Sequence, residues 1–135
     1  MKEPVWLNAA DIYGIHKEII SVSGGKSGIL DVGLIASSLN KAKNVFYYSD
    51  DSDIFELAAV YGYGFVKNHC FIEGNIQVGL IAVYTFLVIN GYELNAINDD
   101  VIKVFSELAA SQDSQTTEIE KLSQWLKSNT QSTQI

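Results

Sequence analysis

The sequence predicts an all-α fold: a bundle of about six helices around one central, buried helix. Three observations support this class. Apolar residues recur at helical spacing in several segments, for example at Ile12, Ile15 and Ile19. Residues 78–89 are apolar nearly all round, which is typical of a helix enclosed by others. With 135 residues, 47% of them hydrophobic and 19% charged, the chain can bury one compact core, and we expect a single domain over residues 1–135.

The first helix is predicted from the signals at its two ends. Asn8 suits an N-cap, and Asp11, three positions later, completes a capping pattern. The helix then continues to about Val22. It ends at Gly24 and Gly25, since glycine readily adopts the left-handed conformation that terminates helices.

The next two helices are also predicted from capping residues. Asp31 caps a short second helix that turns Leu34 inward. Residues 41–52 mix aromatic and acidic side chains without a clear period, and we expect a loop there. Asp53 then opens a third helix over residues 54–68.

Residues 76–90 are predicted to form the central helix. Their β-branched residues, Val88 and Ile89 among them, would also suit a strand. The length of the segment and the stop signal at Gly91 favour a helix.

Two further helices complete the predicted bundle. Asn98 or Asp99 caps a fifth helix that extends to about Ala110. Residues 117–120, Thr-Glu-Ile-Glu, fit a capping box and begin a sixth. The polar residues 129–135 are expected to form a frayed tail.

Charge and composition argue against several classes of function. The formal net charge is −7, so we expect no basic face that could bind nucleic acid. All nine cations are lysines, so the chain has no arginine that could bind a phosphate with two parallel hydrogen bonds. The longest apolar run, residues 78–89, is too short to cross a bilayer, and residues 1–8 lack the pattern of a signal peptide. The single Cys70 forms no internal disulfide. We expect a cytoplasmic protein without nucleic-acid or membrane partners.

Residues 69–75, His-Cys-Phe-Ile-Glu-Gly-Asn, place a base and an acid directly before the central helix. Histidine titrates near neutral pH, so His69 is a candidate general base that takes a proton from an attacking hydroxyl. Glu73 is a candidate ligand for Mg²⁺, which proteins usually hold with one or two carboxylates together with substrate phosphates.

The start of the central helix is a candidate phosphate site. Gly74 and Asn75 permit a tight turn, and the amides that follow, those of Ile76 and Gln77, lie where a helix leaves its N–H groups open to an anion. These four residues are therefore the candidate cofactor-binding residues.

Each of these residues also has a structural interpretation. His69 can be a loop histidine bonded to a backbone carbonyl, and Glu73 can stabilise the helix N-terminus by about 0.3–1 kcal/mol. Gly-Asn pairs occur in many ordinary turns. His16, inside the first helix and without an acid or a glycine turn beside it, is interpreted as structural, and Cys70 as a small buried residue.

Taken together, the residues resemble the death-on-curing (Doc) branch of the Fic/Doc family. Its motif reads His-x-Phe-x-x-(Gly/Ala)-Asn-(Lys/Gly)-Arg, on a loop that leads into the central helix of an all-α fold. His69, Phe71, Gly74 and Asn75 match this motif, and Glu73 stands where the family has an acid. The likeness covers most of residues 7–94, including the segments Ile15–His16, Gly24–Gly25, Asp31–Leu34, Asp53–Ala59, Phe86–Leu87 and Asn90–Tyr92.

The resemblance implies a toxin of a toxin–antitoxin pair. In the family the histidine activates a target hydroxyl, the acid holds Mg²⁺, and the loop and helix N-terminus bind nucleotide phosphates. Death-on-curing members phosphorylate a threonine of elongation factor Tu from ATP, whereas typical Fic members transfer AMP. A helix of the antitoxin docks in a groove and silences the toxin. The implied cofactors are ATP and Mg²⁺, and the implied partners are the cognate antitoxin and a translation protein such as elongation factor Tu.

The sequence departs from the family motif directly after Asn75. Where the family has Lys or Gly followed by Arg, this chain has Ile76 and Gln77, which carry no charge. Two lost charge-assisted contacts, each contributing about 1.5–3 kcal/mol, would slow transfer by orders of magnitude. Lys67 is near in sequence, but the direction of its side chain cannot be derived from the sequence. The alternative function is therefore a catalytically impaired Fic fold that binds a protein or peptide.

Overall fold

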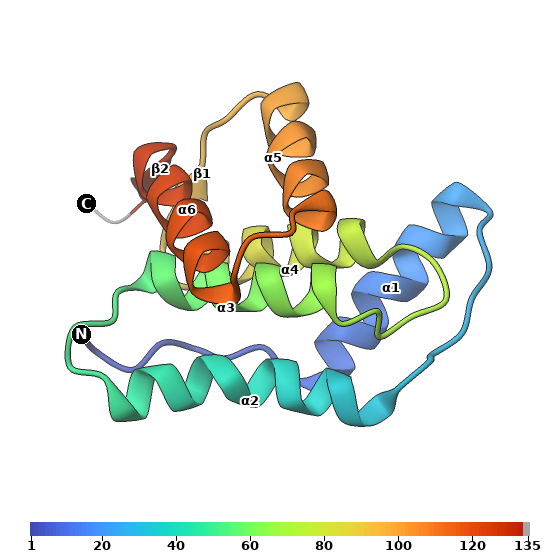
Figure 1. Cartoon of the computed structure of the whole chain (residues 1–135), viewed down its shortest axis with the longest axis horizontal. Coiled ribbons are helices and arrows are strands. Elements are labelled where there is room, and N and C mark those ends of the chain that lie inside the picture. Colours follow the sequence, from blue (N-terminus) through green and yellow to red (C-terminus); the bar gives the residue numbers. More distant parts are fainter. Residues whose placement is uncertain (134–135) are drawn as a thin grey trace.

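The computed structural model describes residues 1–133. Within this range the chain forms six helices and two short strands, arranged as in Figure 1, so the predicted all-α class is confirmed. In chain order the elements are α1 (Ala9–Ser23), α2 (Val32–Tyr48), α3 (Ile54–Lys67), α4 (Asn75–Ile89), β1 (Tyr92–Leu94), α5 (Asn98–Ala110), α6 (Gln115–Ser128) and β2 (Thr130–Ser132).

Side-chain caps confirm three of the predicted helix starts. At α1 the Oδ1 atom of Asn8 accepts from the Asp11 N–H at 2.9 Å, and the Oδ2 atom of Asp11 accepts from the Asn8 N–H at 2.8 Å. Asp31 and Asp53 each accept from the N–H three residues later, at 3.1 and 2.9 Å. Each such cap contributes about 0.5–2 kcal/mol, which explains why the helices begin there.

Two helices, rather than α4 alone as the sequence suggests, form the centre of the bundle. Ten of the 14 residues of α3 are buried, against six of 15 in α4. The two helices lie side by side in Figure 1. They approach closely because small residues face each other: a Cβ atom at Gly79 would lie 2.5 Å from Val66 Cγ2 and 3.2 Å from the Gly62 carbonyl oxygen.

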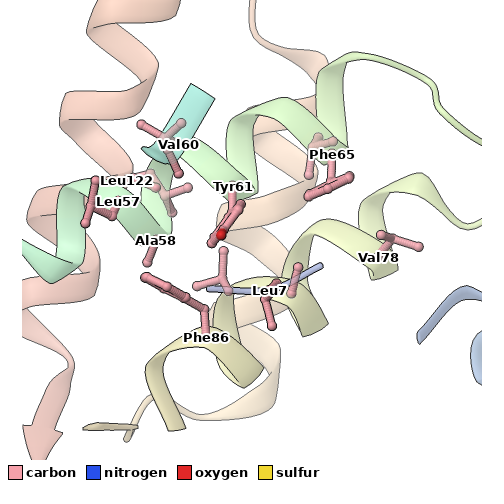
Figure 2. Close-up of a cluster of buried hydrophobic side chains, with 14 of the residues drawn as sticks. Leu7, Leu57, Ala58, Val60, Tyr61, Phe65, Val78, Phe86 and Leu122 are labelled. Carbon is pink, nitrogen blue, oxygen red and sulfur yellow. The ribbon is translucent and has the colours of Figure 1, made fainter. Parts of the chain in front are cut away.

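The remaining helices cover this central pair. α2 lies along one side of α3, α5 and α6 pack on the other side, and α1 packs against α4 (Figure 1). Figure 2 shows the interior, where Leu7 of the N-terminal segment packs beside Tyr61 and Phe86. The rings of Tyr61 and Phe86 meet edge to face, with centroids 4.9 Å apart. In the described part of the chain, no helix is both long enough and apolar enough to span a bilayer.

α2 is longer than predicted. Residues 41–52 are expected to be a loop, but the helix continues to Tyr48. Ala42 is buried, and Val45 and Phe46 pack partly buried against the core, so the inward face continues at a spacing of three to four residues. The polar and aromatic residues between these positions hide the period in the sequence.

The last two helices also begin differently from the prediction. α5 begins at Asn98 without a side-chain cap, so neither Asn98 nor Asp99 has the predicted capping role. α6 begins at Gln115, because the Ser114 hydroxyl accepts from the Thr117 N–H at 3.2 Å. The pattern at Thr117 lies inside the first turn, since a serine three residues earlier competes as the cap.

The expectation of a frayed tail over residues 129–135 is wrong for its first part. β2 pairs antiparallel with β1, with Tyr92 opposite Ser132. The Thr133 N–H also donates to the Gly91 carbonyl at 2.8 Å. Backbone hydrogen bonds hold this pairing, so no apolar alternation reveals it in the sequence. Residues 134–135 lie outside the described range.

Candidate functional site

The predicted site residues lie in one loop and in the first turn of the helix that follows it. We name residues 68–74 the motif loop; it joins α3 to α4 and lies beside α1 (Figure 1). Contacts from α4, from the segment between α1 and α2, and from α1 itself fix its conformation.

Asn75 holds the motif loop from the first turn of α4. Its Oδ1 atom accepts from the Phe71 N–H at 3.0 Å, and its Nδ2 atom donates to the Phe71 carbonyl at 2.8 Å. Both ends of the side-chain amide are thus bonded to one residue of the loop. The backbone N–H of Asn75 takes no part in this pairing.

The segment between α1 and α2 runs antiparallel to the motif loop. The Leu30 N–H donates to the Cys70 carbonyl at 2.8 Å, and the Ile72 N–H donates to the Gly28 carbonyl at 3.1 Å. Cys70 is fully buried, and this burial raises the pKa of its thiol. A buried thiol with a raised pKa is a poor nucleophile, which agrees with the structural interpretation of Cys70.

His16 of α1 supports the motif loop from its buried side. Its Nε2 atom lies 2.9 Å from the Glu73 carbonyl oxygen, and its ring stacks on Phe71 with centroids 3.9 Å apart and planes at 10°. The structural interpretation of His16 therefore holds, but the sequence does not identify the motif loop as its partner. One signal was available: His16 shares a helix face with Ile12 and Ile19, and a polar ring on an apolar face needs a hydrogen-bond partner.

His69, the predicted general base, has an exposed side chain, and its ring has no hydrogen-bond partner within the described residues. Its φ of +49° lies in the left-handed region, which is uncommon for residues other than glycine. Backbone in this region persists only where the surrounding structure holds it, and it is frequent at functional sites. A histidine bonded to a backbone carbonyl, the structural alternative for His69, describes His16 instead. The role of His69 as a base stays a prediction.

Glu73 presents an exposed carboxylate that is anchored on one side. Its Oε2 atom accepts from the Lys26 N–H at 3.1 Å, and no side chain forms a capping hydrogen bond at the N-terminus of α4. Electrostatic stabilisation of this N-terminus by Glu73 needs no such bond and stays a prediction. Across residues 1–133, no three or more His, Cys, Asp or Glu side chains gather into a metal cage. A lone exposed carboxylate fits a Mg²⁺ ion that arrives with substrate phosphates, which supply the other ligands, and does not fit an all-protein site.

Gly74 sets the geometry of the α4 N-terminus. Its φ of +88° and ψ of 12° are left-handed, which glycine adopts without steric cost. The Gly74 carbonyl accepts from the Val78 N–H at 2.9 Å, so the amides of residues 75–77 precede the first helical hydrogen bond. With no side-chain cap, these amides are a candidate anion site. The Ile76 side chain packs against the core, whereas Gln77 is exposed.

Lys67 does not replace the missing cation of the motif. Its Nζ atom donates to the carbonyls of Ala109 at 3.2 Å and Ser111 at 2.8 Å, at the C-terminal end of α5. The last carbonyls of a helix lack helical partners and carry partial negative charge, so a lysine is favoured there. This settles the direction of the side chain: Lys67 caps α5.

A largely apolar cavity of about 460 Å³ lies next to the motif loop. Glu73 and Gly74 form its edge on the loop, and Gln77 and Ile81 contribute from α4. Its other lining residues belong to α1, namely Glu18, Ile19, Ile20, Val22 and Ser23. The cavity thus connects an apolar surface with the candidate anion site.

Comparison with known proteins identifies the family. Residues 6–87 match the sequence model of the Fic/DOC family, a range that includes His16, the motif loop and most of α4. Over 88 residues the chain is 25% identical to Protein kinase doc of Escherichia phage P1, and this alignment covers 65% of the chain and 70% of that protein. Since the family match extends over more than half of the 135 residues, the chain belongs to the Fic/DOC family, as a member of the Doc type.

Proposed function

We propose that this protein is a death-on-curing-type toxin that transfers phosphate from ATP to a protein hydroxyl in the cytoplasm, with elongation factor Tu as the target. One observation carries the proposal: an exposed imidazole, an exposed carboxylate and uncapped helix amides lie together within residues 69–77. The name of the phage P1 relative, Protein kinase doc, supports phosphate rather than AMP as the transferred group.

In this proposal His69 acts as the general base. The oxygen of the target hydroxyl attacks the γ-phosphorus of ATP, the bond from that phosphorus to the β,γ-bridging oxygen breaks, and ADP leaves. His69 accepts the proton of the hydroxyl, for which its ring is available because no protein group bonds it within the described residues. The amides of residues 75–77 hold phosphate oxygens at the start of α4. Mg²⁺ bound by Glu73 and the phosphates would offset phosphate charge.

The cavity beside the motif loop supports an antitoxin helix as the partner. Ile19, Ile20 and Ile81 line it, and Val22 at its edge is 82% exposed. An amphipathic helix buries its apolar face in such a groove, at a spacing of three to four residues. A helix placed there would also cover Gln77 and Glu73, which gives a physical reason for inhibition.

A second function is binding of a protein or peptide without transfer. It is favoured because, in the described part of the chain, no positively charged side chain is found at the candidate phosphate site. The sequence contains no arginine, Gln77 is uncharged, and Lys67 is bonded to the end of α5. The candidate phosphate site is therefore made of backbone amides without a charged side chain known to reach it. In this reading the same cavity remains as the binding groove.

Phosphate transfer separates the two functions. The full chain is incubated with elongation factor Tu, Mg²⁺ and ATP labelled at the γ- or the α-phosphate, beside the variants His69→Ala and Gln77→Arg. We expect γ-label on elongation factor Tu with the wild-type chain and none with His69→Ala. Gln77→Arg should raise the rate about tenfold or more, since a charge-assisted contact contributes about 1.5–3 kcal/mol. α-Label would show AMP transfer instead. If neither the wild type nor Gln77→Arg transfers label, the enzyme proposal is wrong.

A further inference from the structure

His16 contacts three residues of the motif loop, namely Phe71, Glu73 and Gly74. It is 6% exposed, stacks on the ring of Phe71, and its Nε2 atom lies 2.9 Å from the Glu73 carbonyl oxygen. A Cβ atom built on Gly74 would lie 3.6 Å from His16 Cδ2, so the imidazole also lies against the residue that begins α4. One buried side chain of α1 therefore contacts the motif loop at the point where the loop joins α4.

The hydrogen bond determines which nitrogen of His16 carries a proton. A carbonyl oxygen has no proton to donate, so the bond requires the Nε2–H form of the ring. The same bond sets the orientation of the peptide between Glu73 and Gly74. In a trans peptide the C=O and N–H groups point in opposite directions, so a carbonyl turned toward α1 directs the Gly74 N–H away from α1.

The backbone at Gly74 does not by itself enforce this orientation. Gly74 has a φ of +88°, and glycine populates negative φ about as readily as positive φ. The peptide between Glu73 and Gly74 can therefore rotate by about half a turn. The Glu73 carbonyl oxygen would then face away from α1, in the place of the Gly74 N–H. A carbonyl oxygen repels the anion that an N–H group attracts. A donor from outside the loop is needed to hold one orientation, and His16 is that donor.

We infer that His16 is a positioning residue: its Nε2–H holds the Glu73–Gly74 peptide in the orientation that keeps N–H groups, rather than a carbonyl oxygen, at the start of α4. The effect on phosphate transfer rests on the proposed function above. The effect on the conformation of the loop does not, because it follows from the contacts of His16 alone.

Two substitutions separate the hydrogen bond of His16 from its stacking. His16→Gln keeps an N–H donor near the position of Nε2 but loses the stacked ring. His16→Phe keeps a ring against Phe71 but loses the donor. Lys17→Gln, at the exposed neighbouring position on α1, is the matched control, and thermal unfolding shows whether each variant folds.

The first measurement is nitrogen-15 NMR, and it begins with the full wild-type chain before the variants are compared. The ring nitrogen shifts should show His16 protonated at Nε2 and its Nε2 coupled across the hydrogen bond to the Glu73 carbonyl carbon. In His16→Phe the Gly74 amide signal should broaden or split in two as the peptide adopts both orientations, whereas in His16→Gln and Lys17→Gln it should stay single. A wild-type ring that carries its proton on Nδ1 alone, or equal Gly74 signals in His16→Gln and His16→Phe, would overturn the inference.

The second measurement is kcat and KM for ATP in the transfer assay. His16→Phe should lose about 10- to 100-fold in kcat/KM, the order expected for misplaced binding groups, while His16→Gln stays within about threefold of the wild type. Equal losses in the two variants would assign His16 a packing role and overturn the inference. If the wild type transfers no label, the proposed function fails and the Gly74 signals alone decide whether His16 orients the loop.

Discussion

The two histidines of this chain both lie at the motif loop, but in different environments. His16 is buried, stacked on Phe71 and bonded to the Glu73 carbonyl, whereas His69 is exposed, has left-handed backbone, and its ring lacks a partner within residues 1–133. A buried imidazole has to bond to protein groups, since an unpaired polar group away from water costs free energy. An exposed imidazole keeps its nitrogens for a substrate. Burial thus separates a histidine that supports the motif loop from one whose ring is available for the proposed role as a base.

The rest of the site divides in the same way. Phe71 and Asn75 hold the motif loop through contacts inside the protein, while Glu73 and Gln77 present their side chains to solvent. We therefore expect substitutions on the exposed side to change activity more than stability, and substitutions on the holding side to change stability as well.

The largest expected effect is that of His69→Ala on activity. Loss of a general base typically lowers the rate about 10²- to 10⁴-fold. The His69 ring has no hydrogen-bond partner among the described residues. The free energy of unfolding of the His69→Ala variant should therefore differ from that of the wild type by no more than about 0.5 kcal/mol. Label transfer to elongation factor Tu and chemical denaturation measure the two quantities. If His69→Ala transfers phosphate at the wild-type rate, the proposal that His69 acts as the general base is wrong.

Asn75→Ala should have the largest effect on stability. It leaves the N–H and the carbonyl of Phe71 without their partner, at a cost of about 1–3 kcal/mol in the free energy of unfolding. Gln77→Ala, two residues later and exposed, is the matched control and should stay within about 0.5 kcal/mol of the wild type. Urea unfolding of both variants tests this. Equal stability of the two would show that the Asn75 amide does not hold the loop.

Lys67→Met should lower the free energy of unfolding by about 1 kcal/mol, the scale of a lysine at a helix C-terminus. The substitution keeps the aliphatic length of the side chain and removes the charge that caps α5. Its transfer rate should match the wild type. A large loss of transfer rate in a Lys67→Met variant that is still folded would mean that the Lys67 cation reaches the phosphates after all.

An effect of about the same size separates backbone strain from side-chain chemistry at His69. His69→Gly and His69→Ala both remove the imidazole and differ only in the Cβ atom. With φ at +49°, a residue with a Cβ is disfavoured by about 1–2 kcal/mol, so the glycine variant should be the more stable of the two by about 1 kcal/mol. Thermal and urea unfolding compare them directly. An alanine variant as stable as the glycine variant would show that the left-handed backbone at His69 stores no strain.

How well the sequence predicts each helix depends on how local its signals are. The caps at Asn8, Asp31 and Asp53 bond to amides three residues away, so a short pattern suffices to find them. The extension of α2 to Tyr48 depends on packing against other helices, and the strand at residues 130–132 depends on a partner segment almost forty residues earlier. The strand leaves no local signal, and the period of the α2 extension is hidden by the polar and aromatic residues between its inward positions.

The sequence by itself determined the helical class, the motif at residues 69–75 and the absence of arginine, because periodicity, spacing and composition need no coordinates. Only the tertiary structure decided which histidine is exposed and which is buried, and that Lys67 points to the end of α5 rather than to a phosphate. The physical reason is distance along the chain. His16 meets Glu73 across 57 residues and Lys67 meets Ser111 across 44, and contacts between such distant segments exist only after the helices have packed.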